Sequence, residues 1–113
     1  MKQSRVFENP TDCPVVQTMS IIGGRWKPII LYCLMSGKLR FGKLALFIPT
    51  ISRKILTEQL KELKDYGLIN REEYNEQSLK VEYSLTELGK SLIPVINAMC
   101  TWGQHEGRTI KTK

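Results

Sequence analysis

The fold is decided by residues 41–67, which read FGKLALFIPTISRKILTEQLKELKDYG. Their first part predicts a short helix over 41–47, ended by Pro49, and a longer helix is predicted over 52–66, with a serine as its N-cap. Gly67 ends this longer helix. Leucines at helical spacing predict a buried stripe along it: Leu56, Leu60 and Leu63. Two helices joined by a tight turn therefore form the centre of the predicted fold.

Two further helices are predicted ahead of this segment. The first covers 13–22 and is stopped by a pair of glycines, and the second covers 25–36 and ends at Gly37. Apolar residues at helical spacing are expected to face the core: Trp26, Ile29, Ile30, Cys33 and Leu34 on the second helix, and Leu44, Phe47 and Ile48 on the short helix.

The period of the sequence changes after Gly67 from helical to alternating. We expect one strand over 68–74 and a second over 79–85, joined by a loop at 75–78. Thr86 then caps a long final helix that Pro94 should bend. This helix carries an apolar stripe that needs a partner: Leu88, Leu92, Val95, Ile96, Met99 and Trp102.

This order of elements predicts a mainly α fold with a small β-hairpin, in the α+β class. It is the order of a winged helix-turn-helix with an added helix at each end. We expect a flexible N-terminal arm over 1–12, one domain over 13–106 and a basic tail over 107–113. No apolar stretch is long enough to span a bilayer and no signal core is evident, so no membrane contact and a cytoplasmic location are expected.

The positive charge is concentrated in one part of the chain. The whole sequence has a net charge of +6, yet residues 25–64 contain nine basic and only two acidic residues. Cations gathered in this way suit a phosphate-binding surface, because neutralising phosphates releases condensed counterions. Double-stranded DNA is therefore the expected partner, although an ordinary solvated surface would also account for the charge alone.

The N-terminal half of the helix over 52–66 is the predicted reading element for the major groove. Its expected DNA-contacting residues are Ser52, Arg53, Lys54, Thr57 and Lys61. Arg53 can grip guanine with two hydrogen bonds, whereas Lys54 and Lys61 suit phosphate.

Other cations are expected to contact phosphate near helix starts: Arg40, Lys43, Arg25 and Lys27. In the hairpin, Lys80 is the candidate, with Asn75 in the loop. The hairpin sequence is otherwise acidic from Glu72 to Glu76, so its share of DNA binding is left open.

The three cysteines and the single histidine predict neither a disulfide framework nor a metal site, and no cofactor is expected. Cys33 and Cys100 are read as small core residues. Cys13 lies at a predicted N-cap, where the helix dipole favours a thiolate, and is therefore a candidate sensor of a small electrophile or oxidant. An enzyme using Cys13 as nucleophile would need a base that the sequence does not supply, so the chain is not expected to be an enzyme.

Several ordered motifs resemble the HxlR family of winged-helix transcription regulators, which is related in architecture to MarR proteins. The resemblance covers residues 13 to about 103. The matching segments are Cys13-Pro14-Val15, Ile22 to Lys27, Arg40-Phe41 with Leu44, Ile51-Ser52 through Leu56-Thr57, Leu60, Leu63, Gly67-Leu68-Ile69, Val81 to Gly89, and Trp102-Gly103.

The resemblance implies a homodimer that binds a near-palindromic operator through two recognition helices. The dimer would form through the first and last helices, with candidate interface residues Val16, Met19, Leu92, Val95, Ile96, Met99 and Trp102. Some members answer to oxidants, electrophiles or aldehydes through the cysteine that matches Cys13. The sequence departs from the family pattern at Leu79-Lys80, where many members have a proline, and in its acidic wing.

One alternative function stays open at this stage. A winged-helix module can bind another protein without touching DNA, because the fold alone does not fix the function. Arg53 and Lys54 discriminate between the two, since only DNA binding requires them.

Overall fold

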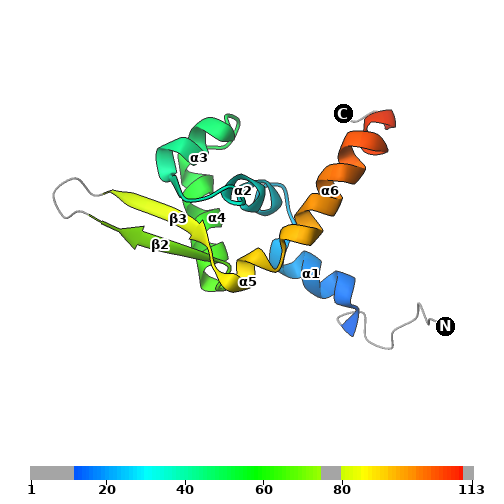
Figure 1. Ribbon diagram of the computed structural model, residues 1–113, viewed down its shortest axis with the longest axis horizontal. Helices are drawn as coiled ribbons and strands as arrows, with labels where there is room; N and C mark the ends of the chain where they lie inside the picture. The colour runs from blue at the N-terminus through cyan, green and yellow to red at the C-terminus, as the bar shows by residue number, and fades with distance from the viewer. Residues whose placement is uncertain (1–11, 75–79, 111–113) are drawn as a thin grey trace.

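The computed structural model describes residues 12–74 and 80–110. The predicted arm lies almost wholly outside these residues, as do the hairpin loop with Asn75 and the last three residues of the tail. The helices are α1 Pro14–Ile22, α2 Lys27–Leu34, α3 Phe41–Phe47, α4 Arg53–Asp65, α5 Glu87–Lys90 and α6 Ile93–His105, and a 3₁₀ turn, η2, follows at Gly107–Thr109. The strands are β1 Leu39–Arg40, β2 Ile69–Glu73 and β3 Val81–Leu85. The predicted mainly α fold with a wing is confirmed (Figure 1).

The sheet has one strand more than the sequence predicted. β3 lies in the centre and pairs antiparallel with β2 and with β1, so the order is β1-β3-β2. Leu39 lies opposite Tyr83, and Ile69 lies opposite Leu85. The segment ahead of α3 was expected only as an extended link, because two residues are too few to show an alternating pattern.

The leucine stripe of α4 is confirmed as the centre of the core. Leu56, Leu60 and Leu63 are all buried, together with Ile30, Leu31 and Leu34 of α2. Two residues that were expected to face the core are exposed instead. Ile29 is 40% exposed while its neighbour Leu31 is buried, and Phe47 is 57% exposed while Leu44 and Ile48 fill the core. Both errors come from short helices, where periodicity leaves more than one face possible.

The C-terminal helix is interrupted where only a bend was expected. α5 ends at Lys90, and α6 begins at Ile93, after two intervening residues, with Pro94 in its first turn. A proline has no N–H for the preceding turn but fits the start of a new helix. Leu88 consequently lies on α5 and is exposed. No helix within the described ranges is long and apolar enough to cross a membrane.

The molecule is extended because α1 and α6 project from its body. The radius of gyration is 16.4 Å, whereas a compact chain of this size has about 13 Å. Figure 1 shows α3, α4 and the hairpin towards one end of the long axis and α1 and α6 towards the other. The two ends can therefore serve different partners.

A close backbone approach fixes α5 against the base of the hairpin. A Cβ atom at Gly89 would lie 2.1 Å from the carbonyl oxygen of Leu68. The hydroxyl of Thr86 caps α5 by accepting from the Gly89 N–H at 2.9 Å and donates to the Gly67 carbonyl at 2.6 Å. Only glycine fits at this contact.

Replacing Gly89 with alanine should destabilise the protein by about 3 kcal/mol, because backbone rather than a flexible side chain must move. Urea unfolding followed by circular dichroism measures the change. Gly42→Ala is the matched control, since no atom lies within 4 Å of a Cβ built there. This control should be neutral or stabilising by up to about 1 kcal/mol. Equal effects of the two substitutions would contradict the close contact.

Candidate nucleic-acid interface

The start of α4 carries the predicted reading residues, and two of them also serve the helix itself. The Ser52 hydroxyl accepts a hydrogen bond from the Ile55 N–H at 3.1 Å, as an N-cap does. The Thr57 hydroxyl donates to the Arg53 carbonyl at 2.8 Å. Arg53, Lys54 and Lys61 are exposed on the same helix. The charged groups of these three predicted residues are thus open to a ligand, and Lys64 in the last turn of α4 is exposed as well.

The guanidinium group of Arg53 lies over the ring of Phe41, 4.9 Å from its centroid. This stacking joins the first turn of α4 to the first residue of α3. A stacked guanidinium keeps the donors along its edge free for a planar acceptor. The geometry therefore suits a bidentate contact with a guanine or a phosphate.

Lys54 and Lys61 take part in exposed ion pairs along α4. Their ammonium groups lie 3.1 Å from Glu58 and 2.9 Å from Asp65, each one turn further along the helix. Pairs of this kind contribute less than about 1 kcal/mol in water. A phosphate can therefore replace the carboxylate. The hydrogen bond that the Lys61 ammonium donates to the Asp65 carboxylate raises the pKa of Lys61, so this lysine is charged at neutral pH.

Arg40 and Lys43 lie at the start of α3 and are exposed. No ion pair involves either of them within the described part of the chain. Arg25 is also exposed, with its guanidinium 4.8 Å from the centroid of the Trp26 ring. Their charges are available to an anion.

The placement of Lys27 argues against the phosphate contact predicted for it. Lys27 is only 8% exposed, and its ammonium donates to Gln59 Oε1 at 3.0 Å and to Glu62 Oε1. It therefore faces the body of α4 rather than solvent. A signal in the sequence could have indicated this, since a cation in the first turn of a helix opposes the helix dipole and calls for a nearby acceptor.

The hairpin has little free positive charge in its described residues. Lys38 lies 3.3 Å from Glu72, Arg71 lies 2.6 Å from Glu73, and Lys80 lies 3.8 Å from Glu82. Lys38 also donates to the Tyr74 hydroxyl at 2.7 Å, and this bond with the adjacent Glu72 raises the pKa of Lys38. Lys80, the predicted wing contact, is half-buried and lies near the Glu82 carboxylate. In the described part of the hairpin, Lys38, Arg71 and Lys80 are thus matched by carboxylates.

The cysteines occupy different environments. Cys13 is the N-cap residue of α1 and is partly exposed. Cys33 packs against the core, and burial raises the pKa of its thiol, which disfavours the reactive thiolate. Cys100 lies on α6 with its thiol 4.0 Å from the Tyr32 hydroxyl. Within residues 12–74 and 80–110, no group of His, Cys, Asp and Glu could hold a metal ion.

At the other end of the molecule, α1 and α6 expose apolar side chains. Five of the predicted interface residues are exposed: Val16, Met19, Val95, Met99 and Trp102. Leu92 is half-buried against the core, and Ile96 is only 4% exposed. Ile96 is therefore a core residue of the single chain, which corrects its predicted role in the interface.

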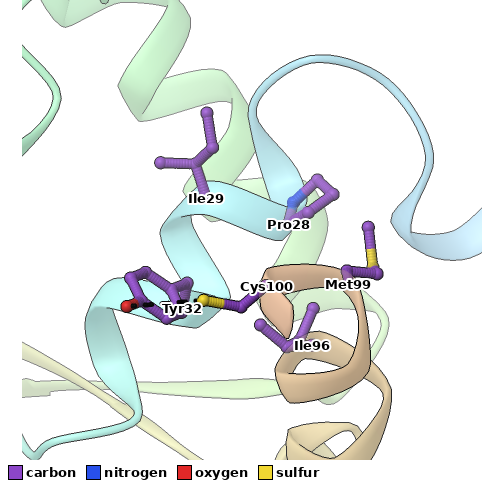
Figure 2. A pocket seen from close by; sticks show the side chains of 6 residues that line it. All are labelled: Pro28, Ile29, Tyr32, Ile96, Met99 and Cys100. Carbon is purple, nitrogen blue, oxygen red and sulfur yellow. Dashed lines mark hydrogen bonds between the residues drawn. The ribbon is translucent and has the colours of Figure 1, made fainter. Parts of the chain in front are cut away.

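A shallow apolar groove runs between α2 and α6 at this end. Its lining residues are Pro28, Ile29, Tyr32, Ile96, Met99 and Cys100 (Figure 2). Figure 2 shows that the first three come from α2 and the last three from α6. Met99 and its neighbours Val95 and Trp102 continue the apolar surface along α6. A surface of this kind is typical of a protein interface.

Comparisons with known proteins agree on the class of protein that this one resembles. Residues 21–111 match the family model described as HxlR-like helix-turn-helix. The HTH-type transcriptional regulator YdeP of Bacillus subtilis is 51% identical over 92 residues, which cover 81% of this chain and 72% of YdeP.

Two solved structures of regulators are similar in fold. The redox regulator HypR in its reduced form has a TM-score of 0.79 and 43% identity, covering 81% of this chain and 91% of that one. The reduced form of the transcriptional regulator YodB from B. subtilis has a TM-score of 0.70 and 39% identity, covering 80% of this chain and 90% of that one.

Proposed function

Since the chain belongs to the HxlR-like helix-turn-helix family of transcription regulators, we propose that it binds a specific DNA sequence as a homodimer. Regulators of this family are not enzymes. The proposed partner is double-stranded DNA with a near-palindromic operator. α4 of each subunit would enter a major groove.

The observation that carries the proposal is the exposed first turn of α4, with Arg53 stacked on Phe41. Arg53 is proposed to read a base, preferably guanine, while Ser52 and Thr57 lie close enough on the helix for further groove contacts. Lys54 and Lys61 are proposed to bind phosphates by giving up their weak carboxylate pairs. Arg40, Lys43 and Arg25 would extend this contact along the DNA backbone.

The dimer is proposed to form through α1 and α6. The supporting observation is the apolar surface on these projecting helices, formed by Val16, Met19, Val95, Met99 and Trp102. Soluble monomers rarely expose so many large apolar side chains in one region. Leu92 would lie at the edge of the interface. A two-fold dimer would place two copies of α4 on the same side of the DNA.

Cys13 is proposed to sense a small oxidant or electrophile. It caps α1, where the helix dipole favours the thiolate, and α1 is part of the proposed dimer interface. The description of HypR as a redox regulator supports this kind of signal. Modification of Cys13 would then alter the spacing of the two reading helices.

The rival function is a winged-helix module that binds a protein instead of DNA. The matched charges of the described hairpin residues would suit such a role. Arg40 and Lys43, which have no ion pair among the described residues, and the stacked Arg53 favour DNA.

Alanine at Arg53 and at Lys54 should have different effects on DNA binding. Arg53→Ala should weaken operator binding by about 1–3 kcal/mol and relax the sequence preference. Lys54→Ala should weaken all duplexes alike and reduce the slope of log affinity against log salt by about 1. Fluorescence anisotropy with the footprinted operator and with a scrambled duplex measures the affinity and its salt dependence. Lys90→Ala, which is remote from α4, is the control. Unchanged duplex affinity in the protein that carries both Arg53→Ala and Lys54→Ala would refute the groove assignment of these residues. A wild-type protein that binds no duplex would favour the protein-binding module.

Introducing charge at the proposed dimer interface should separate the subunits. Trp102→Glu is expected to shift the protein from dimer to monomer in sedimentation velocity, because a carboxylate cannot be buried there unpaired. Leu46→Glu, an exposed apolar residue on α3, is the control. Footprints of the wild-type dimer should show half-site centres about 34 Å apart. A monomeric wild-type protein would refute the dimer.

Serine at Cys13 should preserve operator binding but abolish the response to diamide or an aldehyde. The hydroxyl can still occupy the N-cap but cannot form a thiolate or a disulfide. Anisotropy titrations with and without the oxidant measure the response, and Cys33→Ser and Cys100→Ser are the controls. If the Cys13→Ser protein still responds, the sensor lies elsewhere.

A further inference from the structure

Lys27 forms a polar contact between α2 and α4, the proposed reading helix. This contact has no role in the DNA binding proposed above. Its side chain is 11% exposed, and its ammonium lies 3.0 Å from Gln59 Oε1 and against the Glu62 carboxylate. Both acceptors belong to α4, three residues apart on one face. Lys27 is the charged residue among the buried side chains of the described chain.

This contact is poorly suited to stabilising the fold. Removing an ammonium from water costs several kcal/mol, and an ion pair repays this only in part. The position of Lys27 in the first turn of α2 is also unfavourable for a cation. A partly buried pair of this kind is better explained by geometric specificity, the role for which such pairs are best attested.

The position of the acceptors on α4 indicates which geometry is specified. By helical periodicity, Gln59 and Glu62 lie on one flank of the leucine stripe, and Arg53 and Thr57 lie on the opposite flank. The leucine contacts are apolar and not directional, so alone they allow α4 to roll slightly on the core. Two hydrogen bonds from one ammonium resist that roll.

The other end of this contact is anchored in the body of the protein. Ile30, Leu31 and Leu34 bury α2 in the core, and α2 also packs beside α6 along the groove of Figure 2. Lys27 therefore joins the reading helix to the helix that lies next to α6.

We propose that Lys27 is a positioning residue, which fixes the rotation of α4 about its axis through Gln59 and Glu62 and so sets sequence discrimination. The inference rests on the proposed DNA-binding function. Because its ammonium faces α4, Lys27 does not touch DNA. Its loss should reduce the affinity for the operator while leaving the affinity for unrelated DNA, which depends on phosphate contacts, unchanged.

The test compares Lys27→Met with Lys90→Met. Methionine keeps the apolar stem of Lys27 and leaves Glu62 free to be hydrated, since its side chain is 53% exposed. Lys90→Met removes the same charge from an exposed pair with Glu87. For Lys27→Met, operator affinity should fall about tenfold, as for one lost base contact, with the scrambled duplex bound as by Lys90→Met. The melting temperature should not fall.

Glu62→Gln and Gln59→Leu extend the test on the other side of the contact and take its place if Lys27→Met does not fold. Each should lower the ratio of operator to scrambled affinity, and adding either to Lys27→Met should lower it little further, because all three changes remove one contact. A wild-type protein with no preference for any duplex would refute the proposed function. If the wild-type protein prefers the operator and these variants keep the same ratio of operator to scrambled affinity, only the role of Lys27 is refuted. This holds also where both affinities fall by the same factor.

Discussion

The rest of the structure depends on one contact, the burial of the α4 leucines Leu56, Leu60 and Leu63 in the core. It fixes which face of α4 is inside and therefore which side chains reach solvent. α2 lies under this stripe with its own buried residues, and α3 closes it with Leu44. The cationic first turn of α4 is exposed because the leucines behind it are not.

Charge is distributed unevenly over this frame. In the described residues, the cations of the hairpin are paired with carboxylates, whereas Arg40 and Lys43 beside α4 are not. The attraction for an anion is thus concentrated at α3 and α4 rather than spread over the sheet. This separates the present chain from winged-helix proteins whose hairpins carry basic tips. Recognition would rest on the helix.

The sequence was sufficient for the fold class and for α4, because a long amphipathic helix has a strong period and clear caps. It was insufficient where the decisive contact is long-range. β1 exists only through pairing with β3, the stacking partner of Arg53 is twelve residues away, and Lys27 is buried by residues more than thirty positions later. Ile96 was assigned to an interface because periodicity cannot tell an intramolecular partner from an intermolecular one.

The stacking of Arg53 on Phe41 also has a consequence for the kinetics of recognition. A free arginine side chain loses up to about 2 kcal/mol of rotamer entropy when it is ordered. In this protein the aromatic ring has already restricted the guanidinium before any ligand arrives. Less disorder is then lost on binding, so more of the contact energy is retained in the complex. Because affinity differences between related complexes fall mostly in the dissociation rate, the pre-ordered Arg53 would mainly lengthen the residence time of a DNA complex.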